Sequence, residues 1–214
     1  MHEGHIEPCP RRVRAEHRGE VVLVSDDAQY LWEHDHYPAW YVPEAHVRLD
    51  LIDAGAVRRD ERLPGHVRIA WSALDHWFEE DDEVHQHPRD PYKRVDVRAG
   101  SRHVQVSLDS VVLADSHRPV LLFETTLPTR YYLPKLDVRF DHLTPTTTRS
   151  TCPYKGEAEY WAVSVNDTTH PDLAWGYRYP LPEVGKIADH VCFYNERVDI
   201  VLDGTAVPRP VTHF

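Results

Sequence analysis

The sequence predicts a mostly β protein, of the all-β or α+β class, built from two small antiparallel β units in tandem with few short helices. Two observations carry this prediction: short segments in which apolar and polar residues alternate, and an internal repeat. Alternation with period two places the apolar side chains on one face of a strand, as a half-buried antiparallel sheet requires. A repeat of this length indicates that one structural unit occurs twice.

The clearest strand pattern lies in the second half of the chain. Residues 104–108 alternate apolar and polar side chains, Asp109-Ser110 is a plausible tight turn, and 111–114 is a returning strand. Pro134 ends another strand because proline has no N–H to donate to a sheet. Further strands are predicted at 120–124, 130–133, 160–165 and, with Val138, Phe140 and His142 on one face, 138–142; the first half offers matches at 21–24, 30–32 and 40–42.

The repeat is interrupted in one copy. Between the two halves, residues 33, 40–43 and 47–50 recur 91 positions later as Glu124, Tyr131-Tyr132-Leu133-Pro134 and Val138-Arg139-Phe140-Asp141. Residues 66, 67, 69, 74 and 75 recur 124 positions later. The difference of 33 positions corresponds to a block, roughly residues 150–182, that the first copy lacks. A functional site, if the chain has one, is therefore expected to involve this block.

Few helices are predicted. Pro182 suits the first turn of a helix, and apolar residues at 184, 187, 188 and 191 follow at helical spacing. A second short helix is predicted at 72–79, mirrored at 196–202. The acidic run 79–83 and the proline-containing stretch after it suggest a solvated linker. The expected organisation is a degenerate first copy at 10–83, a connector at 84–96, a complete second copy at 97–205 and a tail at 206–214.

Composition limits the function classes. The net charge of −11 argues against a general affinity for nucleic acid or anionic lipid, because both need a basic face. No apolar run approaches the roughly 18 residues of a membrane span, and residues 1–7 do not resemble a secretory signal. Three cysteines without a close pair suggest reduced thiols. The expectation is a cytoplasmic protein without nucleic-acid or membrane partners; the oligomeric state is open.

Two constellations of the second copy resemble a known family. They are the segment Thr151-Cys152-Pro153-Tyr154-Lys155-Gly156 with Tyr160-Trp161, and Ala174-Trp175-Gly176-Tyr177 followed by Val191-Cys192-Phe193-Tyr194. Together they look like the family known as domain of unknown function 427, in its two-copy, actinobacterial form. The resemblance covers nearly the whole chain and implies a compact β-rich fold. The family also carries a label of nucleotidyltransferase type, so the resemblance implies that activity as one possibility.

The residues do not support that label. Nucleotidyl transfer typically uses a Gly-Ser turn followed by paired carboxylates that hold magnesium. The chain has nine glycines, none in a glycine-rich phosphate loop, and no Asp-x-Asp after a Gly-Ser turn. No dinucleotide fingerprint or Walker motif is present. A nucleotidyltransferase-like activity therefore stays a weak alternative.

Cys152 is the sharpest chemical candidate. The following proline holds it in an extended conformation, at a strand end or in a loop. Lys155 is close enough in sequence to favour the nucleophilic thiolate form, and Glu157 and Tyr160 are possible proton carriers. The candidate catalytic residues are thus Cys152, Lys155 and Glu157. The competing interpretation is that this cysteine is a small buried apolar residue beside a turn.

A second set of residues suggests a binding pocket. Aromatic side chains of the second copy could form its walls, and Arg139, Lys155 and Glu124 its polar anchors. A cation facing aromatic walls suits a carboxylate or phosphate on a flat ligand. The alternative is that these aromatic residues are simply the core of a sandwich. The candidate ligand-binding residues are Glu124, Tyr132, Arg139, Tyr160, Trp175, Tyr177 and Tyr194.

No metal site or cofactor is predicted, although the chain has 16 histidines. The pairs His34/His36 and His85/His87 lie in linker-like sequence, and no Cys-x-x-Cys or His-Glu-x-x-His motif accompanies them. Two hypotheses assign a small-molecule site: a small-molecule-binding β module with its pocket in the second copy, and a cofactor-independent enzyme that uses Cys152 or Lys155 on a small acidic metabolite. The third hypothesis is a scaffold without a small-molecule site.

Overall fold

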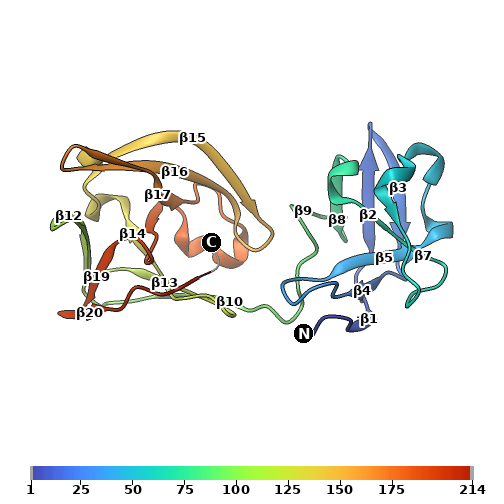
Figure 1. Ribbon diagram of the computed structural model, residues 1–214, viewed down its shortest axis with the longest axis horizontal. Helices are drawn as coiled ribbons and strands as arrows, with labels where there is room; N and C mark the ends of the chain where they lie inside the picture. Colours follow the sequence, from blue (N-terminus) through green and yellow to red (C-terminus); the bar gives the residue numbers. More distant parts are fainter. Residues whose placement is uncertain (1, 213–214) are drawn as a thin grey trace. The chain divides into compact units, whose positions relative to one another are not determined.

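The protein is described by a computed structural model in which residues 2–212 are placed. The chain divides between Tyr92 and Lys93 into two compact units (Figure 1). Both units are antiparallel and mostly β, which confirms the predicted fold class. Within residues 2–212, no helix has the length and apolar character needed to cross a membrane.

The first unit contains two sheets. The larger has the order β1-β4-β5-β7-β6, and the smaller has the order β3-β2-β8-β9. The strands of the larger sheet are β1 (Ile6–Pro8), β4 (Gln29–Leu31), β5 (Ala39–Pro43), β7 (His66–Ile69) and β6 (Val57–Arg58). Those of the smaller sheet are β3 (Glu20–Ser25), β2 (Val13–His17), β8 (His76–Glu79) and β9 (Asp82–Val84).

The second unit repeats this plan and extends it. Its small sheet has the order β12-β11-β19-β20, and its large sheet the order β10-β13-β14-β18-β17-β16-β15. The large sheet comprises β10 (Val95–Ala99), β13 (Val120–Glu124), β14 (Arg130–Pro134), β18 (His190–Phe193), β17 (Thr168–Gly176), β16 (Gly156–Val165) and β15 (Leu143–Cys152). The small sheet comprises β12 (Val111–Ser116), β11 (Val104–Leu108), β19 (Asp199–Leu202) and β20 (Thr205–Val207).

The two units correspond strand by strand. Strands β2 and β3 match β11 and β12 at the 91-position offset, and β7 matches β18 at the 124-position offset. A bulge interrupts the pairing after Ala15 in one unit and after Val106, 91 positions later, in the other. The hairpin turns Arg18-Gly19 and Asp109-Ser110 also match, and all four residues have positive φ, as a tight two-residue turn requires. The repeat read from the sequence is therefore a repeat of backbone structure.

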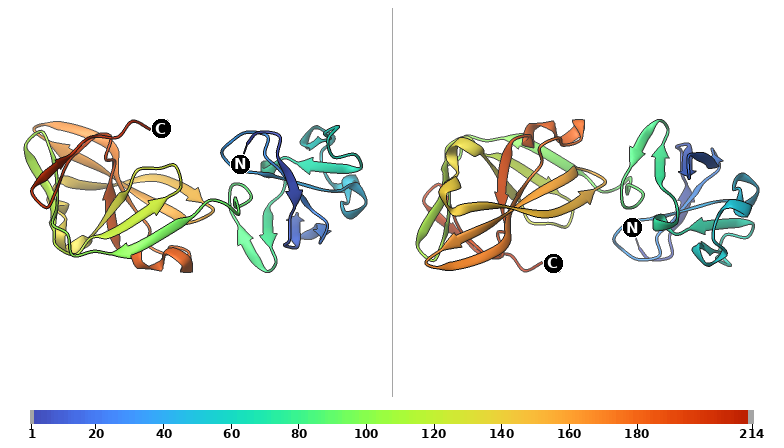
Figure 2. Two further views of the ribbon diagram at one scale, coloured as in Figure 1. Left: turned by 90° about the horizontal axis from the view of Figure 1, so that it is seen from below. Right: turned by 90° about the horizontal axis from the view of Figure 1, so that it is seen from above.

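The main difference is a long hairpin. Strands β15 and β16 have no counterpart in the first unit. The two-residue strand β6 pairs with β7 there, as β17 pairs with β18 in the second unit. Figures 1 and 2 show β15, β16 and β17 as the long yellow-to-orange strands of the second unit. The first strand of this hairpin begins at Leu143, before residue 150.

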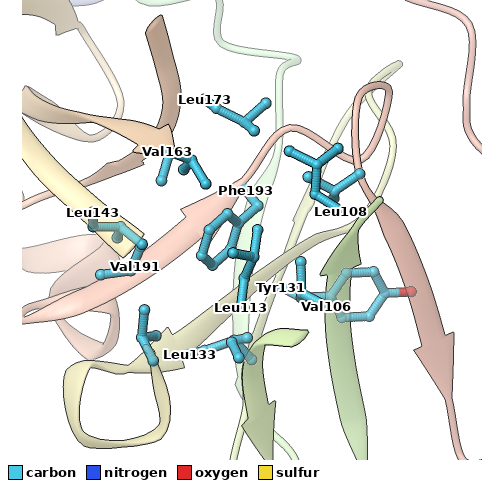
Figure 3. Packing of buried hydrophobic residues seen from close by; sticks show 14 of the residues in the cluster. Val106, Leu108, Leu113, Tyr131, Leu133, Leu143, Val163, Leu173, Val191 and Phe193 are labelled. Carbon is cyan, nitrogen blue, oxygen red and sulfur yellow. The ribbon is translucent and has the colours of Figure 1, made fainter. Parts of the chain in front are cut away.

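The core of the second unit lies between its two sheets (Figure 3). Alternation decides which residues enter it: Tyr131 and Leu133 of β14 point into this core, whereas Tyr132 belongs to a separate apolar cluster on the opposite face of the large sheet. The core also takes Val104, Val106 and Leu108 of β11, as the period-two pattern predicted. The first unit has an equivalent core around Trp40 and Trp77.

The predictions of a helix at 72–79 and of a mirrored helix at 196–202 were wrong. The segment 72–79 ends in strand β8, after the 3-10 turn η4 (Trp71–Ala73), and the segment 196–202 ends in strand β19. Tertiary pairing of β8 with β2 and of β19 with β11 decides the structure of these segments. Residues 138–142 are not a strand either, because 140–142 form the 3-10 turn η6 (Phe140–His142).

The segment that starts at Pro182 is η7 (Pro182–Ile187), two 3-10 turns joined by a kink at Val184. It is not the predicted α-helix, and Val191 lies in β18 instead. The spacing of Val184 and Ile187 reflects burial, since both side chains cover the outer apolar cluster of the large sheet. The remaining 3-10 turns are η1 (Glu44–His46), η2 (Leu49–Leu51), η3 (Ala54–Ala56) and η5 (Lys135–Asp137).

The acidic run at 79–83 is not a linker. It forms the turn of the β8–β9 hairpin inside the first unit. The Glu79 side chain is only 7% exposed and makes an ion pair with Arg11. A run of like charges resembles solvated sequence, but here the strand alternation directs its first member inward.

Candidate functional site

The candidate residues of the second unit lie mostly on one face of its large sheet, opposite the core. Tyr132 of β14, Trp175 of β17 and Cys192 of β18 alternate with core residues and therefore share this face. Val184 and Ile187 of η7 cover them. The members of this outer cluster are Val97, Val120, Leu122, Tyr132, Ala158, Trp175, Tyr177, Val184, Ile187 and Cys192, with Tyr160 and Tyr194 packed at its margin.

The Cys-Pro-Tyr-Lys-Gly segment forms the tip of the β15–β16 hairpin. Cys152 pairs with Gly156 across the turn, and the Lys155 amide donates to the carbonyl of Cys152 at 3.2 Å. Gly156 has φ +95°, a conformation that favours glycine, and a Cβ atom there would lie 3.3 Å from the Tyr179 carbonyl oxygen. The Leu181 amide donates to the Lys155 carbonyl at 3.1 Å, which fixes the tip against the chain that leads into η7.

The hairpin tip places Lys155 against Glu124 at the end of β13. The Lys155 ammonium donates to Glu124 Oε2 at 2.5 Å, and the two side chains are 12% and 8% exposed. Burial lowers the pKa of Lys155, but the neighbouring Cys152 and Glu124 raise it by more than burial lowers it. The pKa of Lys155 therefore lies above its ordinary value. The ammonium group is therefore charged and nearly buried.

The three cysteines differ in access. Cys152 is half-buried, whereas Cys9 and Cys192 are buried. Burial raises the pKa of Cys192 to about 12 and raises the pKa of Cys9 as well. The thiol that was singled out from the sequence is thus the accessible one.

The aromatic candidates form a packed layer. Tyr132, Trp175 and Tyr177 are between 1% and 7% exposed. The Trp175 indole donates to the Tyr132 hydroxyl at 3.2 Å, and its ring centroid lies 4.4 Å from that of Tyr194. Burial raises the pKa of Tyr177 well above its ordinary value and that of Tyr194 to about 12, so both phenols stay protonated. These rings support the hairpin tip and do not form open walls of a pocket.

Two predicted site residues lie apart from this cluster. Arg139 is exposed and forms a bidentate pair with Asp141, at 2.8 and 3.1 Å. Glu157 is exposed on β16 opposite Thr151. Adjacency in the sequence suggested that Glu157 serves the thiol, but alternation along the hairpin separates neighbouring side chains.

A buried ion pair escaped the sequence analysis. The Arg130 guanidinium bonds both oxygens of Glu196, at 2.7 and 2.8 Å, with 9% and 14% side-chain exposure. It also lies over the Trp175 ring, 5.5 Å from the centroid. The repeat could have revealed this pair, because both charged residues are new in the second unit: the matching positions of the first unit hold Ala39 and Ser72.

A pocket of about 330 Å³ lies beside the β15–β16 hairpin. Lys135 lies at its margin, 3.5 Å from Glu159 and 3.4 Å from Asp189, with its ammonium 5.6 Å from the Trp161 ring centroid. Of the predicted ligand-binding residues, Tyr160 lines this pocket, whose cations come from separate segments. It is lined by Lys135, Pro145, Thr146, Arg149, Glu159, Tyr160, Trp161, Arg178 and Asp189.

A β-bulge shapes this pocket. The pairing of β15 with β16 shifts between Pro145 and Arg149. Asp172 holds the bulge by accepting hydrogen bonds from the Thr146 and Thr148 hydroxyls at 2.6 and 2.7 Å. The Arg149 guanidinium donates to the Thr146 and Thr148 carbonyls at 3.2 and 2.7 Å, which positions it at the pocket.

The first unit keeps only part of the site. Glu33 matches Glu124, and Tyr41, which matches Tyr132, donates to Glu33 at 2.8 Å. Arg68 supplies the cation for this carboxylate from the position of Cys192. The first unit therefore neutralises the same carboxylate without a lysine hairpin and without a thiol.

Comparison with known proteins assigns the family. No curated protein matches the chain in sequence. The sequence model of the family described as Domain of unknown function (DUF427), which carries a nucleotidyltransferase-type label, matches residues 5–76 and 96–204. The two matched segments cover most of the chain and fall one in each structural unit. The chain therefore belongs to the domain of unknown function 427 family, with a tandem arrangement of two copies.

Proposed function

We propose that the second unit binds a small acidic molecule with a flat apolar part in the pocket beside the β15–β16 hairpin. The observation that carries the proposal is a 330 Å³ pocket with three cations, Lys135, Arg149 and Arg178, next to Trp161. Pockets of a few hundred cubic ångströms suit small metabolites. Guanidinium groups favour carboxylates and phosphates because they donate in a planar fork.

The charges of the pocket support an anionic ligand. Lys135 is shared between Glu159 and Asp189 at distances that allow only weak bonds. Within residues 2–212, neither Arg149 nor Arg178 has a carboxylate at ion-pair distance; the Arg178 guanidinium instead lies over Tyr179, 5.6 Å from the ring centroid. Two guanidinium groups are thus available to a ligand. The first unit reverses the charge at one position, where Glu44 matches Lys135 and pairs with Arg59.

The test is ligand-induced stabilisation of the full chain. A panel of small aromatic and aliphatic carboxylates and phosphates is screened by thermal shift, and the hits are titrated by calorimetry. We expect at least one saturable ligand whose affinity falls roughly 100-fold or more in Arg149→Ala/Arg178→Ala, because each charge-assisted hydrogen bond contributes about 1.5–3 kcal/mol. The matched control is Arg94→Ala/Arg98→Ala, which removes two exposed arginines of the same unit outside the pocket. Equal affinity in both double variants would reject the proposal.

A second candidate function is thiol chemistry at the hairpin tip. The observation that favours it is the half-buried Cys152 beside the nearly dry Lys155 ammonium. A cation close to a thiol stabilises the thiolate, which is the nucleophilic form. A substrate would be a small electrophilic metabolite, and Lys155 would stabilise negative charge as it forms.

Alkylation of the native protein by iodoacetamide, quantified for each cysteine by mass spectrometry, tests this candidate. Cys9 and Cys192 are buried and serve as internal controls. We expect Cys152 to react faster than a cysteine in an unstructured peptide at neutral pH. It should slow several-fold in Glu124→Gln/Lys155→Met, which removes both members of the ion pair and leaves no unpaired charge. A rate that is unchanged in this double variant argues against an activating role for the cation.

A further inference from the structure

A cluster of metal-ligating side chains lies on the outer face of the small sheet of the second unit. His103 directly precedes β11, whereas Asp115 and His117 lie at the end of β12 and just after it. One ligand atom from each of the three side chains lies within 4.8 Å of the other two. Neither functional proposal uses these residues.

The antiparallel register creates the cluster. Gln105 pairs with Asp115 and Val104 with Ser116, so the next pair outward brings His103 opposite His117. Residues two apart on a strand share a face, which leaves Val104 in the core and turns the imidazoles outward. The two imidazole rings stack, with centroids 4.2 Å apart and an interplanar angle of 12°.

Neighbouring groups hold the cluster in place. His103 Nε2 lies 2.7 Å from Asp115 Oδ1, and the Gln105 amide donates to the other oxygen, Oδ2, at 3.0 Å. The backbone amide of His103 donates to Asp203 Oδ1 at 2.9 Å, and its carbonyl accepts from the Asp203 amide at 2.9 Å. Asp203 lies in the β19–β20 turn and also accepts from Arg102 at 2.7 Å. Such supporting contacts orient ligands before a metal binds.

The first unit provides a contrast on the same scaffold. The positions of His103 and His117 hold Arg12 and Asp26, which form a bidentate pair at 2.8 and 3.1 Å. The position of Asp115 holds Val24. The first unit thus fills the site with an internal ion pair, whereas the second has three groups that can each donate an electron pair to a metal.

We propose that His103, Asp115 and His117 bind a divalent transition-metal ion of the zinc class. Two imidazoles and one carboxylate suit Zn²⁺, Co²⁺ or Ni²⁺, whereas Mg²⁺ and Ca²⁺ prefer oxygen ligands alone. Three protein ligands leave further positions for water or for a group from a partner.

The test counts Zn²⁺ bound to the full chain by equilibrium dialysis with zinc alone. The key variant, His103→Arg/His117→Asp, transplants the ion pair of the first unit into the second and so keeps a side-chain pair that the scaffold accommodates. We expect wild-type protein to bind one more equivalent than this variant. The control variant His34→Asn/His36→Asn should keep that equivalent, because it removes a histidine pair of the other unit.

Two further measurements keep the result unambiguous. The ¹⁵N shifts of the His103 and His117 imidazoles should change on addition of one Zn²⁺ equivalent, and His117→Gln alone should abolish the change at His103. Gln105→Ala should weaken binding roughly tenfold, as is typical when a supporting hydrogen bond is lost. Equal zinc binding in wild type and His103→Arg/His117→Asp, or unchanged imidazole shifts, would overturn the proposal.

Discussion

The two units of this chain have the same strand order but different chemistry. Apart from β6, strands β1 to β9 match counterparts in the second unit by fixed offsets. The second unit adds the β15–β16 hairpin, which carries Cys152, Lys155 and one wall of the cationic pocket. The comparison shows that alternation and turns specify the scaffold, whereas one inserted hairpin and a few substitutions supply the chemistry.

The substitutions concern charged pairs above all. At matched positions, the ion pair Arg12–Asp26 corresponds to His103 and His117, and uncharged Ala39 and Ser72 correspond to the buried pair Arg130–Glu196. Each pair is satisfied locally, so an exchange needs no change in the strands. This makes the first unit a source of matched variants for the second.

The largest effect is expected for Arg130→Ala. It leaves Glu196 with 14% side-chain exposure and without its bidentate partner. Removing one member of a buried ion pair costs about 3 to 5 kcal/mol, since the other charge stays desolvated. Hydrogen exchange of β14 and β18 peptides in the full-length protein measures the loss within the second unit.

The exchange Arg130→Ala/Glu196→Ser installs the residues of the first unit. We expect it to be clearly less destabilising than Arg130→Ala, because it leaves no unpaired charge. If the double variant is as unstable as the single one, the pair contributes mainly through the packing of the guanidinium on Trp175, 5.5 Å from the ring centroid, and not through its charge.

An intermediate effect is expected for Gly176→Ala, in the part of β17 that the first unit lacks. A Cβ atom at this position would lie 2.4 Å from the His190 carbonyl oxygen. Because the clash is with backbone, β17 and β18 must separate, at a cost of about 1 to 3 kcal/mol. Urea denaturation measures the change.

Gly185→Ala is the matched control for this prediction. Nothing lies within 4 Å of a Cβ atom at Gly185, so its substitution should leave the free energy of unfolding nearly unchanged. Equal effects of the two substitutions would show that the β17–β18 pairing is less tight than its register indicates.

The sequence was sufficient for the repeat and for many of the strands, and it singled out the thiol that is half-buried in the structure. Alternation identified β11, and apolar runs identified strands at β12, β13 and β14, whereas the long hairpin begins at Leu143 and not near residue 150. The sequence was insufficient where tertiary pairing decides the structure, as at β8 and β19, for which helices were predicted. The cationic pocket joins Lys135, Arg149 and Arg178 from three separate segments, and no local pattern connects them.

The smallest effect concerns two buried carboxylates with opposite pH dependence, one in each unit. Burial raises the pKa of Glu79 above 4.5 despite the neighbouring Arg11. Its contribution to stability is therefore full below pH 4.5 and is lost as the pH rises through the folded-state pKa. For Glu196 burial acts in the same direction, but the hydrogen bonds from Arg130 outweigh it and lower the pKa. Its contribution is full above pH 4.5 and is lost as the pH falls through the folded-state pKa.

The variants Glu79→Gln and Glu196→Gln should therefore respond to pH in opposite directions. Relative to wild type, Glu79→Gln should become more favourable between pH 4 and pH 7, by about 1 kcal/mol or less, which is the size of an ordinary hydrogen-bond contribution. Glu196→Gln should become less favourable in a lower pH range, as the pH rises through the folded-state pKa of Glu196 toward 4.5, and then stay level. Urea denaturation of both variants at several pH values decides the matter: parallel pH profiles would mean that the two carboxylates have similar environments, and the contrast between the units would not extend to their buried charges.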